Sequence, residues 1–386
     1  MTALMKNLAL AAAAILVAVI IGEAFLRLIG FSYPLPYRID PVRGKVGRAH
    51  AVGVWAVEGN ARFRFNAFGF RDAPRTLEKA PDVLRLAVLG DSFTEALQVN
   101  DDQTYTRLLE QRLNGCFNRP VEVLNFGIGG YGQANQLLTL RHAVLPFKPD
   151  GILLLFYPGN DVADNYPPPS TPDRVAFRLR DSRLVEDRSY LERAWRNPRT
   201  RRLKNGIFAL SDRSRALQLL IWAYGHLGSQ QWAGPQGESP QSLPDPEADP
   251  PNPVLQSPAW QEAWTVTEAL ITEMDRIADG RAIPFWISVV PEPGRVLPPD
   301  APDRPRLPPS KESPYFQAEA RLSSLAERRG MRFIPLREAL ADYAERTRTY
   351  LAGFSPPTLG RGHWNTAGHR AAAETLARSF CRQPWT

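Results

Sequence analysis

The chain has 386 residues, 44% of them hydrophobic, a formal net charge of +7 and two cysteines. This length and apolar content suffice for one large globular domain with insertions, and they exclude an intrinsically disordered chain. The positive charge would suit an anionic partner, but no helix-turn-helix, zinc-finger spacing or RNA-binding signature accompanies it, so nucleic-acid binding is not predicted. Two isolated cysteines are too few for a zinc site, and we expect neither a metal nor another cofactor.

The first thirty residues predict a transmembrane anchor (1–30). Leu8 to Gly22 is an unbroken apolar run that Ala24 to Gly30 extends, and about 20 such residues span a bilayer. Lys6 precedes the run and no clear cleavage site follows it. This pattern favours a single-pass anchor in the inner (cytoplasmic) membrane over a cleaved signal peptide or a buried helix, with the remaining chain in the periplasm. Residues 31–84 show few clear periods and are treated as a connector.

From residue 85 to residue 386, short apolar runs alternate with longer amphipathic ones, a pattern typical of parallel strands joined by crossover helices. The runs lack strict alternation, as expected for strands covered on both faces. We therefore predict an α/β domain with a doubly wound, five-stranded parallel sheet. The predicted strands are Arg85 to Leu89, Val121 to Asn125, Gly151 to Tyr157, Ile283 to Val289 and Met331 to Ile334. The predicted helices are Asp102 to Asn114, Gln133 to Leu145, Trp260 to Asp279, Tyr315 to Arg329 and Thr366 to Phe380.

Two insertions, 162–258 and 291–314, interrupt this alternation. Both leave from strand carboxyl ends, where open parallel sheets bind their ligands, so we expect both to overhang the active-site side. The first contains a basic segment, residues 171–205, with eleven Lys and Arg against five Asp and Glu. This segment is read as a solvated surface, or as a surface that suits an anionic glycan, a lid or a membrane. The same insertion is predicted to hold a helix from Asp212 to Tyr224, capped by Ser211 and stopped by Gly225.

A serine follows the first predicted strand directly, in the sequence Gly90-Asp91-Ser92. A side chain there lies at the ligand edge of the sheet, where helix N-termini and backbone N–H groups can stabilise an oxyanion. Ser92 is therefore a candidate nucleophile. Asp91 and Ser92 would also be ordinary turn or N-cap residues, and this motif alone does not separate the two interpretations.

Three further blocks follow in order, and together with Gly90-Asp91-Ser92 they resemble the SGNH (GDSL-like) hydrolases. The resemblance implies a flavodoxin-like fold, with Ser92 as nucleophile. The segment Asn66 to Arg71 and the end of the anchor also resemble what precedes the domain in membrane-anchored members. The first block, Asn125 to Tyr131, implies that the Gly130 N–H group stabilises the oxyanion. The second block, Gly159 to Asp161, implies that the Asn160 amide group does the same. The third block, His363 to His369, implies that His363 is the base.

One position departs from that family pattern. Relatives carry an aspartate two or three residues before the histidine, whereas this chain has Arg361 and Gly360 there. Losing the acid of such a triad costs roughly 10⁴-fold in rate. The sequence leaves two possibilities: a slow or specialised enzyme in which a backbone carbonyl orients His363, or an inactive relative that binds its ligand. We interpret His369 as structural and Trp364 as a packing residue.

In the implied fold the first and last helices of the domain share one face of the sheet. Cys116 and Cys381 follow or end these helices at the edge opposite Ser92. A Cys116–Cys381 disulfide, consistent with an oxidising compartment, is therefore one hypothesis. Two separate buried thiols are the other.

The sequence thus predicts a serine esterase of SGNH type, acting through an acyl-Ser92 intermediate. The resemblance implies hydrolysis or transfer of a small acyl group, chiefly acetyl, on a carbohydrate of the cell envelope. Its predicted partners are that acylated carbohydrate or another small ester and, through the N-terminal helix, the membrane. A dedicated polysaccharide O-acetyltransferase and a weakly active or inactive glycan-binding or assembly protein remain as alternatives. The sequence indicates no oligomeric state.

Overall fold

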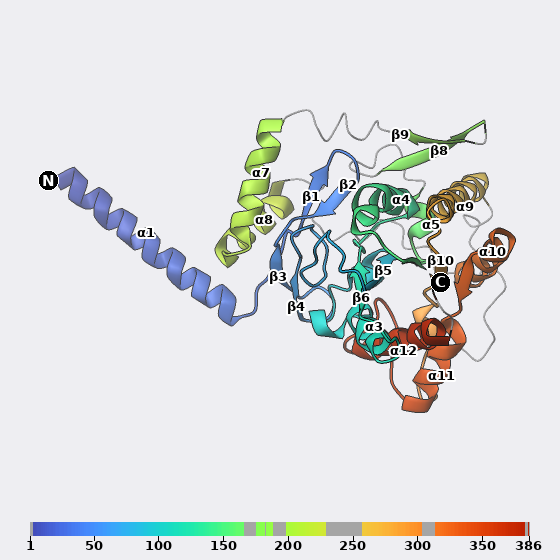
Figure 1. Cartoon of the computed structure of the whole chain (residues 1–386). Helices are drawn as coiled ribbons and strands as arrows, with labels where there is room; N and C mark the ends of the chain where they lie inside the picture. The colour runs from blue at the N-terminus through green and yellow to red at the C-terminus, as the bar shows by residue number, and fades with distance from the viewer. Residues whose placement is uncertain are drawn as a thin grey trace.

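A five-stranded parallel sheet forms the centre of the molecule in this computed structural model, which describes residues 3–165, 175–181, 183–187, 198–228, 257–302, 313–382 and 385 (Figure 1). The strand order is β11-β10-β7-β5-β6, the order of a doubly wound flavodoxin-like sheet. The predicted fold class is confirmed. The strands are β5 (Leu84–Leu89), β6 (Val121–Asn125), β7 (Gly151–Phe156), β10 (Phe285–Val289) and β11 (Arg332–Ile334).

Helices cover both faces of this sheet, which explains why its strands are mostly apolar (Figure 1). One core cluster lies between the sheet and α4, α9 and α10, and a second lies between the sheet and α3, α11 and α12. The sequence did not predict α11. The helices are α4 (Gln133–Thr139), α9 (Pro258–Asp279) and α10 (Pro314–Arg329) on one face, and α3 (Tyr105–Asn114), α11 (Arg337–Thr347) and α12 (Thr366–Arg382) on the other.

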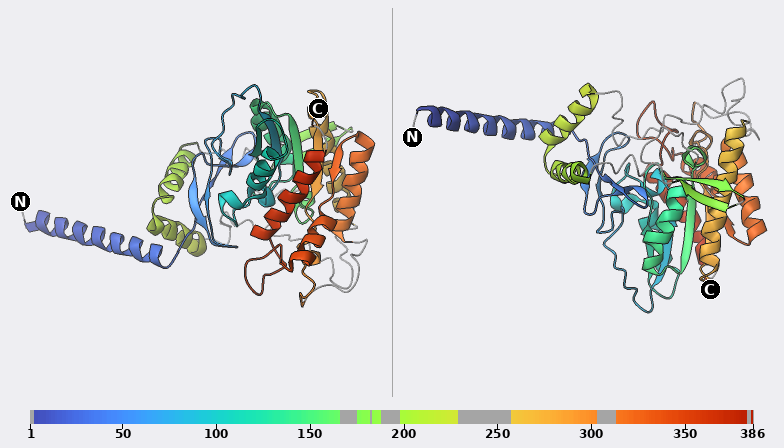
Figure 2. Two further views of the ribbon diagram at one scale, coloured as in Figure 1. Left: turned by 60° about the horizontal axis from the view of Figure 1, so that its bottom comes forward. Right: turned by 90° about the horizontal axis from the view of Figure 1, so that it is seen from above.

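The N-terminal helix α1 (Ala3–Leu28) projects away from the domain (Figures 1 and 2). At 1.5 Å per residue its 26 residues extend about 39 Å, longer than the hydrocarbon core of a bilayer. Among the described residues it is the one helix long and apolar enough to cross a membrane. Its only buried residue is Leu26, near its C-terminal end, so most of its apolar surface is covered by no other part of the described chain.

The connector forms two antiparallel hairpins that pack on the domain. The first hairpin is β1 (Tyr37–Asp40) with β2 (Gly44–Gly47), and the second is β3 (Val52–Trp55) with β4 (Ala61–Arg64). In β4 the side chains alternate between buried and exposed. Phe63 of this strand joins a small apolar cluster with Phe65, Ala51 and Leu97, the last of which belongs to the domain. This cluster holds the second hairpin against the loop that follows Ser92.

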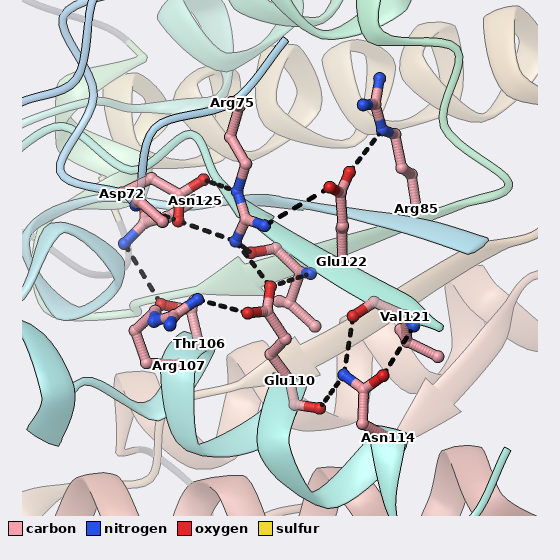
Figure 3. A network of polar contacts seen from close by, with 12 residues as sticks. Asp72, Arg75, Arg85, Thr106, Arg107, Glu110, Asn114, Val121, Glu122 and Asn125 are labelled. Atoms are coloured by element: carbon pink, nitrogen blue, oxygen red, sulfur yellow. Dashed lines mark hydrogen bonds and ion pairs between the residues drawn. The ribbon is translucent and has the colours of Figure 1, made fainter. Parts of the chain in front are cut away.

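The connector is also tied to the domain by a buried arginine, Arg75 (Figure 3). Its guanidinium group contacts Asp72 at 2.9 Å and Glu110 of α3 at 2.6 Å, and it donates a hydrogen bond to the carbonyl oxygen of Val123 in β6. A charged group that is removed from water needs such partners on every side. Residues 31–84 are therefore integrated with the domain at both ends.

The first insertion contains more regular structure than its sequence indicated. Its described residues form the hairpin of β8 (Ala176–Arg180) and β9 (Arg183–Asp187) and the helices α7 (Pro198–Ser211) and α8 (Arg215–Gly228). The predicted bounds of the helix were wrong: Ser211 ends α7 instead of capping α8, and α8 continues past Gly225. The hairpin packs on α4 and α9, and α8 packs on α1. In these described residues the insertion makes no hydrogen bond to Ser92 or His363.

Cys116 and Cys381 form a disulfide, with their Cα atoms 5.9 Å apart. The hypothesis that they pair is confirmed, and its reason holds, because α3 and α12 pack side by side on one face of the sheet. Disulfides of this kind persist in oxidising compartments.

Candidate active site

Ser92 lies where β5 ends and a one-turn helix, α2 (Ser92–Glu95), begins. Asp91 caps this helix, because its carboxylate accepts a hydrogen bond from the Phe93 N–H group at 2.9 Å. The cap fixes the turn that presents the Ser92 hydroxyl group at the carboxyl edge of the sheet. Asp91 therefore has the N-cap role that the sequence left open, and Ser92 is the first helical residue.

His363 lies in the loop before α12, and its side chain contacts Ser92. The Nε2 atom of His363 is 2.8 Å from the Oγ atom of Ser92. The loop is held by Asn365, whose Oδ1 atom accepts the N–H groups of Ala367 and Gly368 at the start of α12. The structure thus brings together two residues that lie 271 positions apart in the chain.

The other ring nitrogen of His363 contacts Glu58, a residue of the connector. The Nδ1 atom is 2.5 Å from Oε2 of Glu58, and Oε1 of the same carboxylate accepts the backbone N–H group of His363 at 2.7 Å. Burial raises the pKa of Glu58, but the hydrogen bonds and charge of His363 outweigh burial and hold this pKa below its usual value. Glu58 therefore stays ionised beside the ring.

A glycine makes this close approach possible. Gly362 has a φ of +71°, and a Cβ atom at this position would lie 2.2 Å from Oε1 of Glu58. Any other residue would displace the carboxylate. The lack of a side chain at Gly362 therefore allows the Glu58 carboxylate to lie this close to His363.

These contacts correct the expectation about the missing acid. A backbone carbonyl does not orient His363, and Arg361, which is exposed, does not take the place of the acid. The role of Glu58 could not be predicted from the sequence because this residue precedes Ser92 and lies in a segment without clear periodicity. The available signal was the stretch Glu58-Gly59-Asn60, a turn sequence between two short runs that form a hairpin.

The first hairpin of the connector supports the glycine loop that follows β6. Glu95, which is fully buried, accepts hydrogen bonds at 2.8 Å from both the Gly129 N–H group and the Tyr37 hydroxyl group. Lys45 of β2 donates a hydrogen bond to the carbonyl oxygen of Gly129. A Cβ atom on Gly129 would lie 3.6 Å from Cβ of Ser92, so this loop adjoins Ser92. The Gly129 N–H group is engaged by Glu95, whereas that of Gly130 has no hydrogen-bond acceptor within the described part of the chain.

Asn160 follows β7, which pairs with β5 in the sheet, so it lies at the same edge as Ser92. It precedes the short helix α5 (Asp161–Asp164), and its backbone carbonyl accepts the Asp164 N–H group at 2.8 Å. Its side-chain Oδ1 atom is buried and has no hydrogen-bond partner among the described residues. Among the described residues, no hydrogen bond joins Asn160 to Ser92.

Two carboxyl groups of this region, those of Asp91 and Asp161, are buried. Burial raises the pKa of Asp91 to about 6, against the lowering effects of the Phe93 N–H group and the charge of His363. Burial and the neighbouring Asp91 raise the pKa of Asp161 well above its usual range. The site thus keeps acidic groups out of water, where their charged forms are disfavoured.

The raised pKa of Asp91 gives a testable pH dependence. The folded state binds a proton at Asp91 up to about pH 6, whereas the unfolded chain releases it near pH 3.8, so stability must fall as pH rises through this window. Two pKa units correspond to about 3 kcal/mol. Asp91→Asn, which keeps the oxygen that accepts the Phe93 N–H group, should gain about that much unfolding free energy relative to wild type between pH 4 and pH 7.

Urea unfolding at both pH values measures this difference. Asp300→Asn, which removes a solvent-exposed carboxyl group instead, is the matched control. If the unfolding free energies of the wild-type and Asp91→Asn proteins change equally between pH 4 and pH 7, Asp91 is ionised in the folded state over this range.

His369 and Trp364 have packing roles, as the sequence indicated. His369 is buried, and its Nδ1 atom accepts the Tyr105 N–H group at 3.3 Å. Burial lowers the pKa of His369 to about 3, so this ring is neutral. Trp364 is buried against the rings of Phe93 and Tyr105. Both residues support the loop that carries His363.

Part of the chain matches the model of a known protein family. Residues 88–223 match the model of the GDSL-like Lipase/Acylhydrolase family. The matched segment contains Ser92, Gly130 and Asn160, whereas Glu58 precedes it and His363 follows it. No curated protein matches the sequence significantly.

Several solved structures are similar to this chain at low identity. A catalytic mutant of an acetylxylan esterase from Geobacillus stearothermophilus is 12% identical with a TM-score of 0.41, covering 81% of this chain and 99% of that chain. A putative lipolytic protein of the G-D-S-L family from Desulfitobacterium hafniense DCB-2 is 12% identical with a TM-score of 0.37, covering 76% and 98%. An α/β hydrolase from the metagenome of Lake Arreo, Spain, is 15% identical with a TM-score of 0.36, covering 80% and 99%.

The family model and the sheet topology agree with each other, and the serine that the model includes is the one at the carboxyl end of β5. The match, which spans residues 88–223, and the sheet topology thus support an ester-bond hydrolase of the GDSL-like lipase/acylhydrolase type.

Proposed function

We propose that Ser92, His363 and Glu58 form a catalytic triad that hydrolyses or transfers a small acyl group through an acyl-Ser92 intermediate. The observation that carries this proposal is the unbroken chain of contacts from Ser92 Oγ to His363 Nε2 and from His363 Nδ1 to Glu58. Such a chain activates a hydroxyl group that is otherwise a weak nucleophile.

In the proposed reaction His363 accepts the proton of the Ser92 hydroxyl group as Oγ attacks the ester carbonyl carbon. The tetrahedral intermediate collapses, the bond from carbon to the alcohol oxygen breaks, and the alcohol leaves with the proton from His363. Water or an acceptor hydroxyl group then attacks the acyl-enzyme with the same base assistance. The Glu58 carboxylate keeps Nδ1 protonated and stabilises the imidazolium ion that forms in each half-reaction.

We assign stabilisation of the oxyanion to the Gly130 N–H group and the Asn160 side-chain amide. One feature supports this assignment: neither the Gly130 N–H group nor the Nδ2 amide group of Asn160 donates a hydrogen bond to another of the described residues. Groups that are free of internal partners can serve the substrate without breaking an existing bond. Lys45 and Glu95 then act on the glycine loop as positioning residues.

The presence of Glu58 weighs against the alternative of an inactive binding protein, because that alternative depended on the missing aspartate. The choice of acetyl as the acyl group and of a cell-envelope carbohydrate as its carrier rests on the resemblance to the family. The site is compatible with a bulky carrier, since the side chains of His363 and Glu58 remain 27% and 24% exposed. A dedicated polysaccharide O-acetyltransferase uses the same acyl-serine chemistry and stays as the second candidate.

The proposed organisation is a transmembrane anchor (1–30), a connector (31–84) and a catalytic domain (85–386) with insertions at 162–258 and 291–314. We place the catalytic domain outside the cytoplasm, in the periplasm, with the anchor in the inner membrane. The disulfide between Cys116 and Cys381 supports this placement, because cytoplasmic thiols are kept reduced.

Labelling with a fluorophosphonate tests the proposed function. The full chain in detergent should gain one covalent phosphonyl group at Ser92, found by mass spectrometry of its peptides, and it should release the phenol from an aryl acetate. Candidate glycans that accelerate phenol release and become acetylated would identify a transferase, whereas release that is unaffected by glycans would identify a hydrolase. A protein that neither becomes labelled nor turns over any ester would refute the catalytic assignment.

A further inference from the structure

Helices α7 and α8 carry an unusual share of exposed apolar side chains. Beyond residue 30, ten large apolar side chains are exposed among the described residues, and six of these belong to α7 and α8. On α7 they recur at the spacing of one helical face, at Leu203, Ile207 and Leu210. On α8, Leu220 and Tyr224 are one turn apart and 66% and 73% exposed. An exposed apolar surface of this extent marks a binding face.

Specific hydrogen bonds hold these helices at the C-terminal end of α1. The carboxylate of Glu23 in α1 accepts the backbone N–H groups of Arg215 and Ala216 at 3.0 and 2.9 Å, and the Ser214 hydroxyl group at 3.1 Å. Glu23 therefore occupies the N-terminus of α8, where a negative charge is stabilised by the helix dipole. Arg27 of α1 donates to the carbonyl oxygen of Arg213 at 2.8 Å.

The same helices are fixed to the connector. Gln218 of α8 accepts the Tyr33 N–H group at 2.9 Å, and Asp212, between α7 and α8, pairs with Arg48 at 2.6 Å. Both views of Figure 2 show α7 and α8 beside the end of α1, between that helix and the sheet. If α1 spans a bilayer, its contact with α8 places this helix pair at the lipid boundary.

From this geometry we infer that α7 and α8 lie on the membrane surface, with their exposed apolar side chains in the interface of an anionic phospholipid bilayer. The inference rests on the proposed membrane anchoring by α1. Glu23 follows the apolar run of α1 directly, so the α8 N-terminus lies at the level where hydrocarbon gives way to headgroups. An amphipathic helix in this position buries its apolar face about 5–10 Å deep.

Charge favours anionic lipid over a neutral apolar partner. The sequence of α7 contains four basic residues and no acidic one. Basic residues beside apolar ones are typical of helices that lie on anionic membranes, because each is attracted to the negatively charged surface. Tyr224 on α8 also suits the membrane interface, because its ring is apolar and its hydroxyl group can bind water.

Site-specific labelling of the full chain in phospholipid vesicles tests this inference. An environment-sensitive fluorophore is attached to single cysteines at Leu203→Cys and Leu220→Cys, with the native disulfide kept oxidised, in vesicles of phosphatidylcholine and phosphatidylglycerol that contain a nitroxide-bearing lipid. Leu16→Cys in α1 reports on the anchor, and Ser323→Cys on α10 is the matched exposed control. All four positions are on the surface, and retained fluorophosphonate labelling at Ser92 verifies that each variant is folded.

We expect quenching at positions 203 and 220 to approach that at position 16 and to exceed that at position 323 by about threefold or more. Quenching at position 16 with none at 203 and 220 would overturn the inference while leaving the anchor in place. Absence of quenching at position 16 would remove the anchor and the inference together. Labels at 203 and 220 that are shielded from aqueous dithionite but not quenched by the lipid nitroxide would mean that protein covers this face, and would also overturn the inference.

Discussion

Ser92→Ala is expected to lower kcat for an aryl acetate by about 10⁴- to 10⁶-fold, leaving only the residual rate that oxyanion stabilisation and substrate binding provide. The reason is chemical: without the Oγ atom no acyl-enzyme forms, and His363 is left to activate water that nothing positions. The fold should be unaffected, since the Ser92 side chain makes no structural contact other than those with His363 and Asp91 in the described residues. Kinetics of the purified full chain in detergent measure the effect.

Controls separate chemistry from folding in this experiment. Ser323→Ala, on α10 and remote from the site, should retain wild-type turnover. Because nucleophile and base act as one unit, the double variant Ser92→Ala with His363→Ala should lose little more than either single variant. Turnover that persists in Ser92→Ala at more than about a hundredth of the wild-type rate would mean that another group is the nucleophile.

Glu58→Gln is expected to lower kcat by about 10³- to 10⁴-fold with little change in KM. The amide is nearly the same size as the carboxylate and its oxygen can still accept the backbone N–H group of His363. It cannot stabilise an imidazolium ion, and an NH₂ group facing Nδ1 would select the wrong tautomer of the ring. The loss should therefore appear in the chemical step and not in substrate binding.

The conservative variant Glu58→Asp distinguishes charge from mere structure. It retains the carboxylate on a shorter side chain and should recover part of the lost kcat. Glu78→Gln, an exposed glutamate in the same connector, should be silent. If Glu58→Gln and the wild-type protein hydrolyse the ester at similar rates, the contact with His363 has no catalytic importance and Ser92 and His363 act as a dyad.

The strands could be predicted from the sequence because most of their residues are buried and each strand is a short, mostly apolar run. Val121 to Asn125 was predicted with its observed bounds, and the others differ by one or two residues at their ends. The edge that carries Ser92, Gly130 and Asn160 followed from the topology, since parallel strands present all their carboxyl ends on one side. The Cys116–Cys381 pair followed from the same topology.

The connector and the first insertion could not be predicted as well, for physical reasons. The strands β1 to β4 have four residues each, too few to establish a period. A serine before an apolar run suggests an N-cap, which favoured Ser211, but Ser214 caps α8 by accepting the Leu217 N–H group. The carboxylate of Glu23, far away in the sequence, accepts the N–H groups of Arg215 and Ala216. The contact of Glu58 with His363 could not be predicted either, because it forms only when folding brings the turn between β3 and β4 to the loop that contains His363.

The position of Glu58 has a practical corollary for anyone who trims this protein. The segment that matches the family model, residues 88–223, lies between Glu58 and His363, so a recombinant fragment cut to those limits would lack two of the three residues of the proposed triad. Expression trials that remove the apolar N-terminus should therefore start well upstream of residue 58, and should keep enough of the first hairpin for Lys45 and Tyr37 to hold the glycine loop. In the proposed triad, the connector thus supplies one of the three residues.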